Sequence, residues 1–387
     1  MIQLLLAIIY LSFISLGLPD ALLGAGWPVM CEDFGVPLSY AGIISLIIAA
    51  GTIVSSLLSD RLTLRFGTAR VTAFSVATTA VALLGFSVTR SYWVLLLWAV
   101  PYGLGAGSVD ASLNNYVALH YSSRHMSWLH CMWGIGASTG PYVMGYALTA
   151  GKGWYMGYRY IALIQIVLTA VLVLSIPIWK ARPAGQTKEG EKQRKPLGIK
   201  EILRIPGAKE VLIAFFCYCA AEQTAILWSS TYLVMHNGLD ETAAASFASF
   251  YLLGLTLGRG LSGFLTIKIN DTNMIRLGQG LMVLGIATML LPFGTAASMI
   301  GLMLIGLGCA PVYPCIIHST PDHFGPENSQ ALIGVQMASA YLGTLLVPPL
   351  FGLVAQHISA SLLPFFLAAV VGLMILMCEI LNRKSAY

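Results

Sequence analysis

Three carboxylates stand inside long apolar stretches of the sequence: Asp20, Asp110 and Glu222. An ionised side chain is costly in an apolar interior, so such residues commonly mark a path for ions or polar solutes. Burial favours the neutral form of a carboxyl group, which lets it bind and release a proton near neutral pH. The alternative for each acid is a structural one, a carboxylate held in a hydrogen-bonded network.

Small and polar residues accompany Asp110 at helical spacing. Gly103, Gly107 and Asn114 fall on the same helix face as Asp110, one or two turns away. A stripe of small residues is typical of close helix packing. Packing alone does not explain an acid there, because Ala or Ser would pack without the cost of desolvating a charge. We therefore expect Asp110, like Asp20, to take part in proton coupling.

Glu222 and Gln223 lie close to two aromatic residues, Tyr218 one turn earlier and Trp228 farther along. Acceptors, donors and an aromatic face together suit a pyranose, whose hydroxyls need hydrogen bonds and whose CH face stacks on a ring. The alternative, for Trp228 above all, is an aromatic belt or a hydrogen bond between helices. The other candidate substrate contacts are Asn114, Asn115, His130, Trp133, Tyr313 and Gln336.

Two of these candidates need a separate comment. Gln336 is favoured because little else in its apolar segment is polar. His130 titrates near physiological pH when unperturbed, yet a lone His in an apolar helix is equally often a donor between helices.

The composition indicates that most of the chain is surrounded by lipid instead of water. Of 387 residues, 57% are hydrophobic and 10% are charged, against about 25% charged in a soluble domain. The seven Cys show no paired disulfide or zinc spacing, and no phosphate-binding GxxxxGK[ST] loop is present. We expect no cofactor, no metal and no enzyme activity. An intramembrane enzyme using Asp20 and Asp110 as a dyad is a formal competitor that lacks a protease signature.

A membrane span needs about 20 mostly apolar residues. The first apolar segment lacks the basic start of a signal peptide and exceeds its length, so we expect it to be a spanning helix. Polar and Pro/Gly-rich breaks divide the chain into twelve segments: 4–30, 39–59, 69–89, 92–118, 126–150, 159–180, 208–236, 241–266, 273–293, 296–319, 329–356 and 359–382.

The positive charges orient these segments. With the N-terminus inside, most of the 21 Lys and Arg fall in cytoplasmic loops, and only Arg90, Lys152 and Arg159 fall in outer ones. We expect a multi-pass protein of the cytoplasmic (inner) membrane with both termini in the cytoplasm. The net charge of +5 then requires no nucleic-acid partner.

The chain is expected to divide into two six-helix bundles, 1–180 and 207–387, joined by a cytoplasmic linker. The linker is the polar segment 181–206, whose charges are equally suited to lipid headgroups. A shift of 207 positions superimposes similar residues of the two halves: Gly51 and Gly258, Arg61 and Lys268, Gly136 and Gly343, Pro141 and Pro348, Gly145 and Gly352. Two parallel repeats of this kind place a substrate site at their interface near the bilayer midplane.

The segment SLLSDRLTLRFGTAR, residues 56–70, resembles the cytoplasmic loop signature of the major facilitator superfamily. The resemblance implies a conformational latch in which the acid pairs with basic groups and helix ends. Its second copy, GRGLSGFLTIK at 258–268, has no acid in the corresponding place. We expect Arg259 in this copy to act in gating or to pair with a loop acid. The residues that carry the first copy are Asp60, Arg61, Arg65, Gly67 and Arg70.

Four further segments resemble the fucose and glucose/galactose permease branch of this superfamily: LPDALLGAGWP at 18–28, GSVDASLNN at 107–115, LHCMWGIGASTGP at 129–141 and GLGCAPVYP at 306–314. The resemblance implies that Asp20 takes part in proton coupling, that an acid belongs at Asp110, and that His130 is a substrate or coupling residue. The family's polar residue one turn before Asp20 is Gly17 here.

The sequence therefore predicts an all-α membrane protein with twelve transmembrane helices in two pseudo-symmetric bundles. We expect a monomer in the lipid bilayer that moves a small polar solute, a monosaccharide, together with protons by alternating access. The alternatives are a drug/proton antiporter with a broad apolar pocket, a transporter-like receptor without flux, and coupling to sodium in place of protons.

Overall fold

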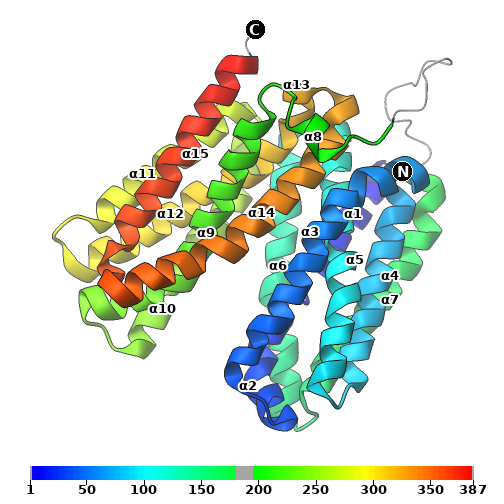
Figure 1. Ribbon diagram of the computed structural model, residues 1–387, viewed down its shortest axis with the longest axis horizontal. Helices are drawn as coiled ribbons and strands as arrows, with labels where there is room; N and C mark the ends of the chain where they lie inside the picture. Colours follow the sequence, from blue (N-terminus) through cyan, green and yellow to red (C-terminus); the bar gives the residue numbers. More distant parts are fainter. Residues whose placement is uncertain (1, 180–194, 386–387) are drawn as a thin grey trace. The chain divides into compact units, whose positions relative to one another are not determined.

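The structure is a computed structural model that describes residues 2–179 and 195–385, and every regular element in these ranges is a helix (Figure 1). Within these ranges, eight stretches are long and apolar enough to cross a membrane by length and composition. Each of the twelve expected segments coincides with a helix. The first segment, expected to be continuous, is instead broken into α1 (Ile2–Gly17) and α2 (Leu22–Phe34).

Proline explains the break. Pro19 has no backbone N–H, so the Ser15 carbonyl four residues earlier loses its helical hydrogen bond. Gln165 Nε2 donates to this carbonyl instead, over 3.0 Å. Asp20 consequently lies in the short turn between α1 and α2. Interrupted helices of this kind occur in transporters where the irregular backbone lines a binding site.

The remaining helices follow the expected segments closely. The long ones are α3 (Ala41–Phe66), α4 (Thr68–Val88), α5 (Tyr92–His120), α6 (Ser123–Thr149), α7 (Trp154–Trp179), α9 (Ala208–Asn237), α10 (Glu241–Leu265), α11 (Asp271–Met289), α12 (Gly294–His318), α14 (Pro326–Val354) and α15 (Leu363–Ser385). The short helices α8 (Ile199–Ile202) and α13 (Thr320–Phe324) lie between long ones.

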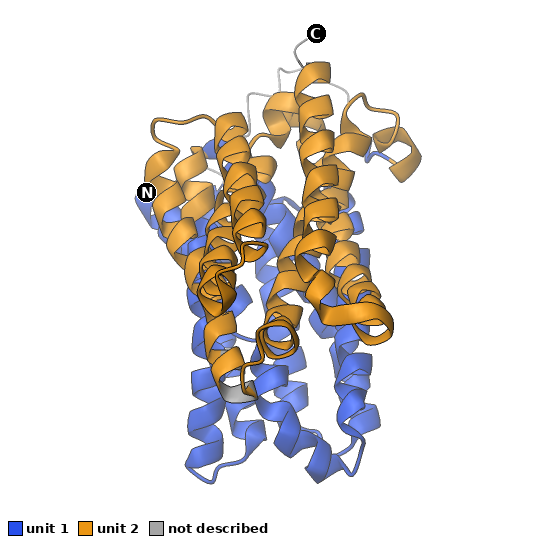
Figure 2. Ribbon diagram, turned by 90° about the vertical axis from the view of Figure 1, so that its left-hand side faces the viewer, with its two compact units in different colours: residues 1–120, 129–197 blue, residues 121–128, 198–387 orange. Residues whose placement is uncertain are grey.

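The chain forms two compact units, shown in different colours in Figure 2. Unit 1 contains residues 1–120 and 129–197, and unit 2 contains 121–128 and 198–387. Helix α6 therefore begins in unit 2 and continues in unit 1. The boundary after residue 197 falls within the expected linker 181–206, of which residues 181–194 lie outside the described part of the chain.

Two of the three repeated glycine pairs make equivalent contacts inside the two units, whereas Gly145 meets nothing within 4 Å and Gly352 packs against Trp228. A Cβ on Gly51 of α3 would lie 3.1 Å from the backbone of Leu104 on α5, and one on Gly258 of α10 would lie 2.5 Å from Ala310 on α12. Gly136 packs α6 directly on α1, and Gly343 packs α14 directly on α9. The matched residues therefore serve matched helix pairs, as two pseudo-symmetric bundles require.

Candidate functional site

Asp20 occupies the interruption between α1 and α2. Trp133 of α6 donates from Nε1 to Asp20 Oδ2 over 2.8 Å, and the Tyr102 hydroxyl of α5 donates to Oδ1 over 3.4 Å. We expected a buried acid, but Asp20 is exposed, because the turn after Pro19 leaves one side of the residue uncovered. Its carboxylate is thus held by two donors and also open to solvent.

Close packing of α1 against α6 brings Trp133 to Asp20. Any Cβ on Gly17, Gly136 or Gly140 would collide with the backbone of the facing helix. The glycine at position 17, where the resemblance implied a polar residue, therefore has a packing reason: the Trp133 carbonyl lies directly against it. A larger residue there would push apart the two helices that hold the carboxylate.

Asp110, Asn114 and His130 form a buried chain of hydrogen bonds in unit 1. Asn114 Nδ2 donates to Asp110 Oδ1 over 2.8 Å and to the Asp110 carbonyl over 3.0 Å. The amide oxygen of Asn114 then faces His130 Nε2 at 3.1 Å, so this nitrogen must carry the hydrogen. The three predicted residues are 6%, 0% and 5% exposed. Asp110 is thus the buried acid, in contrast to Asp20.

A group of polar residues adjoins Asp20 through Tyr102. A cavity of about 10 Å³, room for roughly one water molecule, is lined in part by Ser15, Thr79, Tyr102 and Gln165. Thr79 Oγ1 donates to Gln165 Oε1 over 2.9 Å. Because Tyr102 also contacts Asp20, the group is connected to the exposed carboxylate by one hydroxyl.

In unit 2, Glu222 is paired with Arg259. Arg259 Nη2 of α10 lies 3.2 Å from Glu222 Oε1 of α9, and the two side chains are 7% and 15% exposed. We expected Arg259 to act in gating or to pair with a loop acid. The structure gives it an acid within the bundle, because a buried guanidinium needs an anion at contact distance. One of the two carboxylate oxygens of Glu222, Oε1, is therefore already bonded to Arg259.

The predicted substrate contacts fall into two groups according to how far their side chains are buried. The side chains of Asn114, Tyr218 and Gln336 are completely buried. Gln336, the candidate favoured from its apolar segment, exchanges hydrogen bonds with Thr320 Oγ1 over 3.1 Å. These three side chains are not available to a solute in this arrangement, and Gln336 joins α14 to α13 instead.

Five other candidates keep accessible surface. Tyr313 of α12 packs its ring edge-to-face on Tyr218 at 5.8 Å and donates to Met337 Sδ over 3.2 Å. Trp228 donates from Nε1 to the Pro348 carbonyl over 2.9 Å, which is the interhelical role left open by the sequence. The half-buried set is Trp133, Glu222, Gln223, Trp228 and Tyr313, whereas Asn115 is buried.

The Major Facilitator Superfamily model matches residues 9–302 and 211–385 of this chain. The chain belongs to this superfamily. It is accordingly a membrane transporter and not an enzyme.

Three known proteins show how far the similarity of this chain extends. The fold matches the outward conformation of FucP, the E. coli fucose:proton symporter, with a TM-score of 0.80, 14% identity and 97% of each chain covered. The glucose/mannose transporter GlcP of Bacillus subtilis is 20% identical over 79% of this chain and 77% of its own length. Bypass of stop codon protein 6 of Saccharomyces cerevisiae is 23% identical, and the match covers 66% of this chain but only 56% of the yeast protein.

The superfamily's loop signature lies at the junction of α3 and α4. Asp60 is 4% exposed and accepts from the Leu197 backbone N–H at 3.3 Å, whereas Arg61, Arg65 and Arg70 are exposed. Gly67 separates the two helices with φ of 79°, a conformation that favours glycine. Asp60 thus binds the backbone of the segment just before α8, a partner that the sequence did not indicate.

Asp271 and His318 are two further polar residues that were not identified from the sequence. Asp271 at the start of α11 contacts His318 of α12, with 2.5 Å between Oδ2 and Nδ1, and it also accepts from Ser123 of α6. Asp271 lies three residues beyond Lys268, outside the second loop copy, whose position corresponding to Asp60 is Ile267. The only sequence signal was the helix start at Asn270, whose side chain accepts from the Asn273 N–H over 2.9 Å. Glu379 of α15 accepts two hydrogen bonds from Arg276 of α11.

Proposed function

We propose that this transporter takes up a monosaccharide together with protons by alternating access. The observation that carries the proposal is the Asp20 carboxylate, which is held in a helix break by Trp133 and Tyr102 and remains open to solvent. An accessible acid can exchange a proton with water while the two donors fix its position. The protein acts as a monomer in the cytoplasmic membrane, with both termini inside.

Proton binding at Asp20 is coupled to solute binding through Trp133, which contacts both the carboxylate and the solute. Trp133 Nε1 satisfies the charged carboxylate, and its half-buried ring offers an apolar face to a sugar. Protonation weakens the acceptor and so releases the indole toward the solute. Asp110, within electrostatic range of Asp20, provides a second charge that Asn114 and His130 hold fixed.

Sugar binding is supported by the mixture of groups that keep accessible surface. Glu222 and Gln223 provide acceptors and an amide donor, and Tyr313 and Trp228 provide rings. The structural likeness to FucP and the sequence likeness to GlcP agree with a sugar but extend only to fold and distant kinship. A drug/proton antiporter would favour amphipathic cations over sugars at the same groups.

Purified protein in liposomes tests the proposal. Labelled monosaccharides are offered outside with an inward proton gradient, and accumulation above the outside concentration is expected, with loss when an ionophore collapses the gradient. Asp20→Asn is expected to abolish accumulation while sugar exchange continues. Accumulation by Asp20→Asn equal to that of the unaltered protein would reject the role of Asp20.

A matched screen separates the competing functions. Sugars, hydrophobic cations and sodium are compared for their effect on the melting temperature, because a ligand that binds the folded protein stabilises it. Stabilisation by monosaccharides is expected. Stabilisation by cations alone would favour the antiporter, and accumulation driven by a sodium gradient alone would replace the proton.

A further inference from the structure

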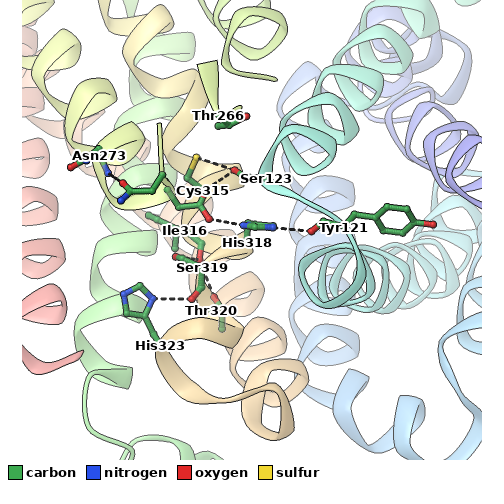
Figure 3. A network of polar contacts seen from close by, with 12 residues as sticks. Tyr121, Ser123, Thr266, Asn273, Cys315, Ile316, His318, Ser319, Thr320 and His323 are labelled. Atoms are coloured by element: carbon green, nitrogen blue, oxygen red, sulfur yellow. Dashed lines mark hydrogen bonds and ion pairs between the residues drawn. The ribbon is translucent and has the colours of Figure 1, made fainter. Parts of the chain in front are cut away.

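His318 lies at the end of α12 in a polar cluster that no part of the proposed sugar site includes (Figure 3). Its Nδ1 is 2.5 Å from Asp271 Oδ2, and its Nε2 is 3.0 Å from the Tyr121 carbonyl. The Ser123 hydroxyl donates to the same Asp271 carboxylate and lies 3.8 Å from Cys315 Sγ. The cluster thus joins α6, α11 and α12 within unit 2.

Counting donors fixes the charge of His318 in this arrangement. A peptide carbonyl has no hydrogen to donate, and an ionised carboxylate only accepts. With Asp271 ionised, both ring nitrogens face acceptors only, so both carry a hydrogen and the ring is an imidazolium. A neutral ring would direct a lone pair at one of the two oxygens. These distances require a hydrogen on Nε2 and a second proton between Nδ1 and Asp271 Oδ2.

The groups around His318 are compatible with this charge. Asp271 of α11 and Asp322 of α13 both act on the ring electrostatically. The ring also meets the carbonyl of Tyr121, which lies just before α6, while the exposed Arg124 of α6 donates to His125. The cation thus faces two acids.

The same cluster fixes residues 121–128, the part of the first half of the chain that belongs to unit 2. Trp128 packs on Gly263 and against Phe264, at 5.6 Å between ring centroids. The hydrogen bonds of Tyr121 and Ser123 hold the other end of this segment. Helix α6 then continues into unit 1, where it carries His130 and Trp133.

We infer that His318 is a second proton-binding site, whose charge holds the start of α6 against α11 and α12. Loss of the proton removes the hydrogen bond to Tyr121 or to Asp271 and releases the segment. Because α6 is continuous from Ser123 to Thr149, this release changes the position of Trp133, the donor to Asp20. The site does not depend on which solute the transporter moves.

Hydrogen exchange of the full-length protein in nanodiscs tests this site. The protection of the 121–128 amides, corrected for the intrinsic rate at each pH, is expected to fall about tenfold as pH rises through the titration of His318, the factor of one lost hydrogen bond to a charged group. His318→Gln is expected to abolish this pH dependence. His323→Gln is the matched control, because His323 makes a local hydrogen bond to the Ser319 carbonyl, at 2.8 Å, and packs beside Phe324.

Nitrogen-15 NMR of labelled histidines measures the proton directly. Two protonated ring nitrogens on His318 are expected at pH 5.5, and one at alkaline pH. If His318→Gln does not fold, Asp271→Asn is used, and the midpoint of the His318 titration is expected to move to lower pH. A neutral His318 at pH 5.5, or the same pH dependence of exchange in His318→Gln and the unaltered protein, would overturn the inference. Failure of sugar transport alone would leave this result unaffected.

Discussion

At the scale of single residues, the acids inside the bundles differ in what their partners leave available. Asp20 is open to solvent and can exchange a proton, whereas Asp110 is enclosed with Asn114 and His130. Glu222 lies in contact with Arg259, at 3.2 Å between Oε1 and Nη2. The three acids thus differ in the hydrogen-bond and ion-pair partners that surround them.

The pair of Glu222 and Arg259 predicts a strongly non-additive pair of substitutions. Glu222→Gln leaves a buried guanidinium without its anion, which costs about 3–5 kcal/mol. Glu222→Gln combined with Arg259→Met removes both charges, and most of the lost stability is expected to return. Thermal unfolding in detergent measures both variants. A double variant that is less stable than either single one would show that the pair does not compensate charge.

Asn114 predicts a second effect at this scale. Asn114→Ala leaves Asp110 Oδ1 and His130 Nε2 without their shared partner, and the loss is expected to be about 1–3 kcal/mol. The melting temperature reports it. Thr78→Ala is the control, because Thr78 is half-buried and its hydroxyl bonds within its own helix, to the Phe74 carbonyl. Equal melting temperatures for the two variants would contradict a buried network.

At the scale of helices, glycine contacts decide which elements approach closely. Gly136→Ala places a methyl group against the Ile14 carbonyl, so α1 and α6 must separate. A loss of about 1–3 kcal/mol is expected, together with loss of transport, because Trp133 moves away from Asp20. Gly145→Ala on the same helix meets nothing within 4 Å and is expected to preserve both. Transport by Gly136→Ala at the normal rate would show that this contact does not position the site.

The helices themselves were predictable because apolar length and polar breaks determine where a chain can cross a bilayer. The break at Pro19 was not, since Pro is tolerated inside spans such as α5 and α14, and only the Gln165 contact shows how the freed carbonyl is satisfied. Asn114 and His130 were proposed separately, but nothing in the sequence joined them. Asp271 and His318 are 47 positions apart in ordinary polar surroundings, so their contact exists only in three dimensions.

At the scale of the whole molecule, the distribution of Lys and Arg predicts how the chain lies in the membrane. Exposed Arg65 lies in the last turn of α3, and exposed Lys152 lies between α6 and α7. If basic loops stay in the cytoplasm, a cysteine in place of Lys152 faces the outside and one in place of Arg65 does not. The native cysteines are buried or half-buried, which keeps the background low.

Labelling of intact cells with a membrane-impermeant maleimide checks this orientation. Lys152→Cys is expected to react in whole cells and Arg65→Cys only after the membrane is opened, with the unaltered protein as background. The His318 cluster lies where α12 ends and α11 begins. The reversed labelling pattern would place this cluster on the outer side of the membrane. The proton of His318 would then be exchanged with the medium instead of the cytoplasm, so the labelling result decides which pH the second site senses.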